Sequence, residues 1–240
     1  MEITKEKTVA DIVTENIKTA HVFKKYGIDF CCGGGITLEN ACAKNNVDQT
    51  VLEKELLKVN TVVDAMHDYD SWKLDFLIDY IINIHHTYVN EGLPILSQYA
   101  NKVAKVHGQH YPEVIEINKL FHEVANELLT HLKKEEQVLF PFIKQLVEAE
   151  KEGDLDGLPP FGSVNNPIKM MEHEHENAGD IFKEIAKLTN NYTTPEDACN
   201  TFKALYAKLD EFEQDLHRHI HLENNILHPK AIALEKKLIH

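Results

Sequence analysis

The sequence predicts an all-α protein in which a small helical domain precedes a four-helix bundle. From about Leu74 onward, apolar residues recur at the spacing of amphipathic helices, and segments rich in Gly, Pro, Asn and Asp separate these stretches. The first 58 or so residues differ, because short helical pieces there flank a stretch of cysteine and glycine. At 240 residues the chain is long enough to build its core without disulfides.

The amino-terminal region, residues 1–59, is predicted to be the small helical domain. Its helical pieces are TVADIVTENIKTAHVFKKYG and NVDQTVLEKELLKV, which lie on either side of the Cys-Cys-Gly-Gly motif. The polar residues 60–71 are predicted to form a linker, and residues 72–240 are predicted to form the bundle.

Four long amphipathic segments make up the predicted bundle. They read LDFLIDYIINIHHTYV, VIEINKLFHEVANELLTHL, DIFKEIAKL and TFKALYAKLDEFEQDL. The separators are HGQHYPE, GDLDGLPPFGSVNNP and NNYTTPED, of which the middle one is the longest. Four helices with one longer middle connection are typical of a bundle.

An internal repeat lies within the bundle. His131 opens HLKKEEQVLFPFIK and His219 opens HIHLENNILHPKAI, and in both a Glu follows the His by four residues and a Pro follows the Glu by six. His86 precedes His131 by 45 residues, and His175 precedes His219 by 44. The bundle is therefore predicted to be a duplicated helical hairpin.

The repeated residues are predicted metal ligands. Residues four apart share one face of an α-helix, so each His-x-x-x-Glu pair offers a nitrogen and a carboxylate in one direction. Four imidazoles and two carboxylates are too many for one tetrahedral zinc ion, whereas donors without thiolate suit iron or manganese. Two metal ions, with iron the first choice, are therefore predicted, in an order of His and Glu that differs from the ferritin-like Glu-x-x-His. The candidate ligands are His86, His131, Glu135, His175, His219 and Glu223.

Two alternatives stand beside this prediction. An acidic, histidine-rich helix can be only a solvated face, and the duplication is what favours a metal site over that interpretation. Side chains next to the candidate ligands also compete for the same roles, and helical phase must decide between them. The competing neighbours are His85, His173, His221 and Glu136.

Two prolines of the bundle are predicted to bend helices, and several other histidines are predicted to lie outside the ligand set. Pro141 and Pro229 are each predicted to kink a helix just beyond the metal ligands, because proline breaks the backbone hydrogen-bond ladder. The histidines predicted to be surface groups, or groups that surround the ligands, are His107, His110, His122, His217 and His228.

Cys31 and Cys32 form an adjacent pair followed by three glycines, which allow backbone shapes closed to other residues. A bond between neighbouring cysteines closes only a small strained ring, so a reducing compartment fits better than a disulfide framework. Thr37 is predicted to cap a helix beginning at Leu38, which would place the pair before a helix N-terminus and favour thiolate. Simple apolar packing is the alternative for the pair. The cysteines predicted to be packing residues are Cys42 and Cys199.

Bulk properties exclude two classes of partner. A formal net charge of -14 leaves no basic footprint for nucleic acid. The start of the chain, MEITKEKTVADIV, lacks the apolar core of a secretory signal, and no stretch approaches the roughly 20 apolar residues of a membrane span. The sequence therefore predicts a cytoplasmic protein that binds neither nucleic acid nor membrane.

The motifs YGIDFCCGGGITLENAC, HLKKEEQVLFP, EHEHENAG and HIHLENNILHP follow one another along nearly the whole chain. They resemble the hemerythrin-like di-iron proteins, specifically the family that repairs iron-sulfur clusters damaged by oxidative or nitrosative stress. The resemblance implies a hemerythrin-like four-helix bundle with two non-heme iron ions bridged by Glu135 and Glu223. Four ligand histidines, instead of the five of oxygen-carrying hemerythrins, imply redox or iron-transfer chemistry. One departure is His228, which stands where the first copy has Phe140.

Two mechanisms follow from the resemblance. In one, the centre donates iron to damaged iron-sulfur proteins. In the other, it reduces nitric oxide or oxygen, an enzymatic activity of the nitric oxide reductase type. In either, Cys31 and Cys32 are the predicted reactive pair that handles nitric oxide, electrons or iron. The alternative is a di-iron gas or redox sensor, or an oxygen-binding hemerythrin-like protein, that acts through a separate partner; a homodimer is compatible with each.

Overall fold

The computed structural model describes residues 3–4, 6–60, 68–153 and 159–239. Within these ranges the regular structure is helical, and the one bridge between extended backbone segments joins Thr8 to Thr37. The predicted all-α class is therefore confirmed. No helix in the described ranges is both long enough and apolar enough to cross a membrane.

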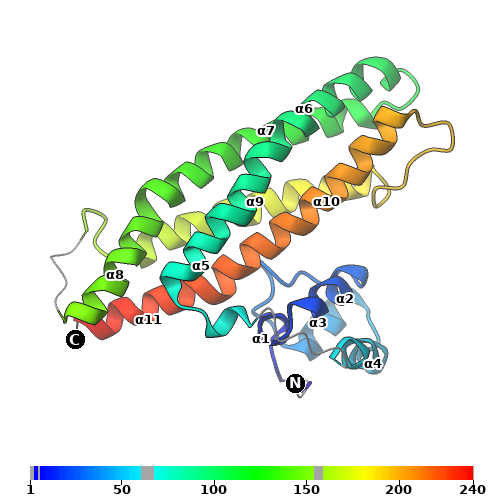
Figure 1. Cartoon of the computed structure of the whole chain (residues 1–240). Helices are drawn as coiled ribbons and strands as arrows, with labels where there is room; N and C mark the ends of the chain where they lie inside the picture. The colour runs from blue at the N-terminus through cyan, green and yellow to red at the C-terminus, as the bar shows by residue number, and fades with distance from the viewer. Residues whose placement is uncertain (1–2, 5, 61–67, 154–158, 240) are drawn as a thin grey trace. The chain divides into compact units, whose positions relative to one another are not determined.

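The helices follow one another along the chain as Figure 1 shows. The amino-terminal elements are α1 (Val9–Glu15), the 3-10 turn η1 (Ile17–Thr19), α2 (Ala20–Lys25), α3 (Leu38–Asn45) and α4 (Gln49–Asn60). The next elements are the 3-10 turn η3 (Tyr69–Ser71), α5 (Leu74–Tyr80), η4 (Ile81–His86), α6 (Thr87–His107) and α7 (Glu113–Lys134). The remaining elements are η5 (Glu135–Leu139), α8 (Phe140–Glu152), α9 (Asn165–Leu188), α10 (Asn200–Leu222), η6 (Glu223–Leu227) and α11 (His228–Ile239).

The chain divides into two compact units. The first consists of residues 1–78, 146–156 and 217–240, and the second consists of residues 79–145 and 157–216. Helices α5, α8 and α10 each contribute to both units.

The predicted linker, residues 60–71, lies partly outside the described residues. Its last described residues form η3, whose Trp72 cap donates a backbone hydrogen bond to the Tyr69 carbonyl. The predicted domain boundaries at residues 59 and 72 stay predictions.

The second unit is a four-helix bundle built from α6, α7, α9 and α10, and its packing can be followed around one side chain. Phe212 of α10 stacks on Phe182 of α9, with ring centroids 5.8 Å apart, and meets Phe121 of α7 edge-on at 6.4 Å. Tyr88 of α6 lies 5.9 Å away. A Cβ atom at Gly92 of α6 would lie 3.3 Å from the Phe212 ring, so the small residue lets the helix approach closely. The predicted four-helix bundle is thus confirmed.

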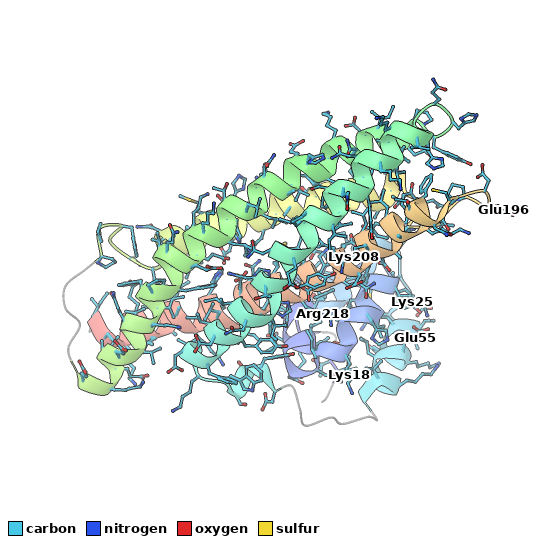
Figure 2. The ribbon with its side chains drawn as sticks, turned by 45° about the horizontal axis from the view of Figure 1, so that its top comes forward. Lys18, Lys25, Glu55, Glu196, Lys208 and Arg218 are labelled. Carbon is cyan, nitrogen blue, oxygen red and sulfur yellow. The ribbon has the colours of Figure 1, made fainter. Side chains whose placement is uncertain are left out.

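The amino-terminal helices of the first unit have regular caps and a small apolar core. Thr8 caps α1 in a capping box with Asp11, and the predicted Thr37 cap of α3 is confirmed, since its side chain accepts a hydrogen bond from Asn40. An ion pair between Lys25 and Glu55, 2.8 Å apart, joins α2 to α4 at the surface (Figure 2). The core residues include Ile12, Val13, Phe23, Leu38, Leu52 and Leu56.

The cysteine motif depends on one of its glycines for a close approach. A Cβ atom at Gly34 would lie 2.4 Å from the Phe30 carbonyl oxygen, so no side chain fits there. Gly34 also accepts a hydrogen bond from the Ala10 amide at 2.8 Å, which ties the motif to α1. Among the described glycines only Gly27, Gly153 and Gly162 have positive φ. None of the three glycines of the motif is among these, so the motif's requirement for glycine is steric room at Gly34.

Three π-helical segments interrupt the long helices at predicted ligand positions. Segment η4 ends at His86, while η5 begins at Glu135 and η6 begins at Glu223. The residue before each predicted kink, Phe140 or His228, donates its amide hydrogen to the carbonyl of the glutamate five residues earlier. The irregularity thus starts at each glutamate, ahead of the prolines, and π segments of this kind are frequent at functional sites.

Candidate metal centre

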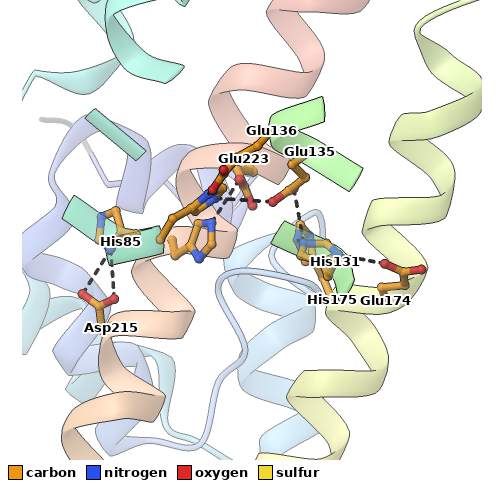
Figure 3. Close-up of polar contacts among 10 residues, drawn as sticks. His85, His131, Glu135, Glu136, Glu174, His175, Asp215 and Glu223 are labelled. Atoms are coloured by element: carbon orange, nitrogen blue, oxygen red, sulfur yellow. Dashed lines mark hydrogen bonds and ion pairs between the residues drawn. The ribbon is translucent and has the colours of Figure 1, made fainter. Parts of the chain in front are cut away.

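Three histidines and one glutamate of the second unit direct their side chains at one another (Figure 3). Glu135 Oε1 lies 3.3 Å from His131 Nε2, and Glu135 Oε2 lies 3.4 Å from His86 Nε2. His175 Nε2 lies 2.9 Å from His131 Nε2. No more than 3% of any of the four residues is exposed. The bundle unit therefore brings together four of the six predicted ligands, from η4, α7, η5 and α9.

This arrangement fits a bound transition metal. Donor atoms that meet one ion at right angles lie about 3 Å apart, because metal bonds to nitrogen and oxygen are about 2.1 Å long. The separations of 2.9, 3.3 and 3.4 Å among the facing nitrogens and oxygens are of this size. Imidazole nitrogen and carboxylate oxygen, without thiolate, are ligands that iron and manganese accept. The second unit thus contains a buried His/Glu cluster suited to a metal centre.

Two further glutamates hold the outer nitrogens of these histidines. Glu136 Oε1 lies 2.7 Å from His86 Nδ1, and Glu174 Oε2 lies 2.9 Å from His131 Nδ1. A carboxylate at Nδ1 fixes the tautomer that leaves Nε2 free for a metal and fixes the plane of the ring. As predicted, Glu136 does not share the helix face of His131. Its carboxylate instead contacts Nδ1 of His86.

The hydrogen bond with His131 lowers the pKa of Glu174 to about 2, against the opposing effect of burial and with further help from Lys134. Glu174 is consequently ionised over the physiological range. Sequence reasoning missed this residue because it acts across helices, from α9 to α7. The one signal for it was the acidic and histidine-rich run in which it precedes His175.

The other two predicted ligands lie in the first unit. His219 Nε2 is 3.1 Å from Glu223 Oε1, and both side chains are buried, with 1% and 0% of the residue exposed. The pair repeats the i, i+4 relation of His131 with Glu135. Each unit thus contains one His-x-x-x-Glu pair whose nitrogen and carboxylate meet on one helix face.

The histidines that competed with the predicted ligands have other surroundings. His85 is buried, but its Nδ1 lies 3.1 Å from both carboxylate oxygens of Asp215. His173 is exposed, with 71% of its side chain accessible. His221 Nδ1 lies 2.9 Å from Asn225 Nδ2, and burial lowers the pKa of His221 to about 4. None of these three joins the clusters described above.

His228 is not a surface group, because its side chain is fully buried. At the equivalent position of the first copy, Phe140 is also buried, and its ring stacks on the His86 imidazole at 5.6 Å with an interplanar angle of 23°. The second copy therefore places a polar ring in the interior where the first copy places an apolar one.

Cys31 does not have the thiolate character that its position predicted. Cys31 Sγ lies 3.7 Å from Cys32 Sγ and 3.4 Å from Asp29 Oδ1. The hydrogen bond with Cys32, burial and the charge of Asp29 together raise the pKa of Cys31 well above its usual value, so Cys31 is a thiol at neutral pH. The hydrogen bond with Cys32, the burial and the charge of Asp29 outweigh any lowering of the Cys31 pKa by the helix N-terminus.

The two remaining cysteines differ from each other. Cys42 is buried, as a packing residue should be. Cys199 is exposed, and its Sγ lies 3.2 Å from His107 Nε2, so its predicted packing role is wrong.

Comparison with known proteins identifies both halves of the chain. Residues 5–60 match the ScdA_N family, described as a domain of unknown function (DUF542). Residues 77–231 match the family described as the hemerythrin HHE cation binding domain. The cysteine motif falls in the first match, and all six predicted ligands fall in the second.

Curated relatives are similar to this chain along nearly its whole length. The iron-sulfur cluster repair protein YtfE of Escherichia coli O81 is 37% identical over 231 residues, which cover 96% of this chain and 99% of that protein. The probable iron-sulfur cluster repair protein of Haemophilus influenzae is 38% identical over 213 residues, 88% of this chain and 90% of that protein. YtfE of Edwardsiella ictaluri is 34% identical over 229 residues, 95% of this chain and 98% of that protein. The chain therefore belongs to the iron-sulfur cluster repair family of hemerythrin-like proteins.

Proposed function

We propose that this protein repairs iron-sulfur clusters of other proteins through a carboxylate-bridged di-iron centre. The observation that carries the proposal is the buried cluster around Glu135 in the second unit, whose His-x-x-x-Glu pair recurs as His219 and Glu223 in the first. The names of the relatives, which match along nearly their whole length, support the same activity.

The six ligands can be shared between two ions. If both glutamates serve both ions, each ion would receive two imidazole nitrogens and two carboxylate oxygens. This donor set lacks sulfur, which favours iron over copper(I) or structural zinc. We propose that the two ions are held by the six ligands that the repeat predicts, His86, His131, Glu135, His175, His219 and Glu223.

The side chains around the ligands prepare the centre for redox chemistry. Bound iron supplies one-electron reduction and oxidation. Glu136 and Glu174 hold His86 and His131 with Nε2 inward, so the donor atoms need little reorganisation when the metal changes charge. The Phe140 ring covers His86 and keeps water from that side of the imidazole.

Repair can proceed by iron donation or by removal of the damaging agent, and burial favours the second. An ion that leaves must break contacts with ligands of which no more than 3% is exposed. Reduction of nitric oxide or oxygen leaves these ligands in place. We therefore propose a retained centre that acts on a small molecule in the cytoplasm, with damaged iron-sulfur proteins as the clients that benefit.

Metal content measured during repair tests this proposal. After anaerobic loading with iron, the protein should hold two irons per chain, consume nitric oxide or oxygen, and keep its iron while a damaged client enzyme recovers. Glu135→Ala should lose iron and repair together. Glu127→Ala, which changes an exposed glutamate on the same helix, should lose neither. Iron lost in step with client recovery would establish donation instead, and wild-type protein that binds no iron would overturn the centre itself.

The cysteine pair can be tested separately. We propose that Cys31 and Cys32 assist turnover without binding the resident irons, because the six predicted ligands include no sulfur. The double variant Cys31→Ser with Cys32→Ser should therefore keep its iron while repair or nitric oxide turnover falls. Loss of iron from this variant would make the pair part of the metal site.

A further inference from the structure

The helix that carries His219 and Glu223 presents two different faces within the first unit. His219 and Glu223 meet on one face. Residues 217, 221 and 225 are each offset by two positions from 219, 223 and 227, and two residues turn an α-helix by about 200°. The row of His217, His221 and Asn225 therefore lies on the back of the ligand pair.

The cysteine loop, here the segment Phe30–Cys32, is docked on this back face. The Phe30 ring meets the His217 imidazole edge-on, with centroids 5.8 Å apart, and meets the His221 imidazole at 6.1 Å. Segment η6 also packs against α1, to which the same motif is tied through Gly34. The thiols and the ligand pair are thus on opposite sides of one helix.

Asn225 makes the polar contacts between the helix and the loop. Its Nδ2 atom donates toward the Phe30 carbonyl at 3.3 Å and the Cys31 carbonyl at 3.4 Å, and lies 2.9 Å from His221 Nδ1. An amide nitrogen has two hydrogens, so three acceptors around it hold it in one orientation. The backbone of Cys31 is therefore attached to the helix directly.

Asn225 and Glu223 also belong to the same π-helical segment. Segment η6 spans five residues, and its widened turn is closed by the hydrogen bond from the His228 amide to the Glu223 carbonyl. Because both side chains project from this one turn, a change in the backbone at Glu223 displaces the amide of Asn225. Segment η6 can thus transmit a backbone change from the face of Glu223 to the face of Asn225.

We propose that Asn225 is a positioning residue that latches the cysteine loop to the ligand helix and links the reactivity of Cys31 and Cys32 to metal bound at Glu223. The latch follows from contacts in the first unit alone, whereas the link rests on the proposed function, since it requires metal at Glu223. Linkage is reciprocal, so metal that favours the docked loop is itself bound more tightly when the loop is docked. The dithiol therefore responds to the centre through the helix, without ligating it.

Thiol alkylation measures the latch directly. Cys31 and Cys32 are treated with iodoacetamide under anaerobic conditions, and modification is followed by mass spectrometry in metal-free and iron-loaded protein. In Asn225→Leu, which has a similar size and no donor, Cys31 should react about tenfold faster than in wild type, since a lost hydrogen bond is worth about 1.4 kcal/mol. An Asn225→Leu variant that reacts as slowly as wild type would overturn the latch.

A matched control excludes general loosening. Lys230→Ala removes the ion pair with Asp70, 2.8 Å long, which joins the neighbouring turn of the same helix to η3. It should leave the Cys31 rate unchanged, and circular dichroism should show equal helix content in all variants. Acceleration in Lys230→Ala equal to that in Asn225→Leu would overturn the assignment to Asn225.

The metal dependence tests the link and separates it from the proposed function. Iron should slow alkylation of Cys31 several-fold in wild type and have no effect in Asn225→Leu. Wild type that binds two irons without any change in alkylation would overturn the link and leave the proposed function intact. Wild type that binds no iron would overturn the proposed function, while the metal-free rates would still decide the latch.

Discussion

The two copies of the His-x-x-x-Glu helix share their backbone and differ in their surroundings. In each copy the glutamate opens a five-residue π segment closed by the amide of the residue before proline. In the second copy, the back face formed by His217, His221 and Asn225 carries the cysteine loop. The equivalent positions of the first copy are exposed, and they are occupied by Leu129, Lys133 and Gln137.

This difference separates two requirements on one helix. Metal ligation fixes the residue types on the inner face and the widened turn that presents the glutamate, and these features appear twice. The outer face has no such requirement, so one copy leaves it exposed and the other uses it to hold a second reactive group. Substitutions at the ligands, in the interior, around the ligands and on the outer face test how far the two copies differ.

The largest effect is expected at the shared glutamates. Glu135→Ala and Glu223→Ala should each remove nearly all bound iron, because each carboxylate serves both proposed ions. Metal analysis after anaerobic loading, with Glu127→Ala as the reference, measures this. One iron retained in either variant would show that the two copies bind metal independently.

The interior position next to the prolines should respond unequally to exchange. Phe140→His places a polar ring against the His86 imidazole in a buried apolar site and should cost about 2–4 kcal/mol of unfolding free energy. His228→Phe, in a site already built around a ring of similar size, should cost less. Urea unfolding of the metal-free proteins gives both free energies. A larger cost for His228→Phe than for Phe140→His would contradict the expected order.

A smaller effect is expected at the glutamate that orients His131. Glu174→Ala should weaken iron binding about tenfold, the lower end of the range for a carboxylate behind a metal-binding imidazole. Competition with a chelator measures the affinity. Glu176→Ala, two residues away on the same helix and exposed, should bind iron as wild type does. Equal affinity in both variants would mean that the first copy orients His131 without Glu174.

The fold and the paired ligands could be predicted from sequence because they depend on spacing along one helix. The apolar period gives the bundle, and a four-residue offset places His131 beside Glu135 and His219 beside Glu223. Glu174 could not be predicted, because its contact crosses from one helix to another. The pKa of Cys31 could not be predicted either, since it depends on the hydrogen bond with Cys32, on burial and on the approach of Asp29, and these follow from the folded structure.

The smallest effect is expected on the outer face of the first copy, at the position that matches Asn225. Gln137 and Asn225 each stand third in a π segment, but Gln137 is exposed. Gln137→Leu should therefore change the unfolding free energy by less than about 0.5 kcal/mol and leave iron content and Cys31 alkylation unchanged. If Gln137→Leu accelerated alkylation as Asn225→Leu does, the cause would be disturbance of a π segment in either copy. If Asn225→Leu accelerates Cys31 alkylation and Gln137→Leu does not, the difference between the copies lies in the contacts with the cysteine loop.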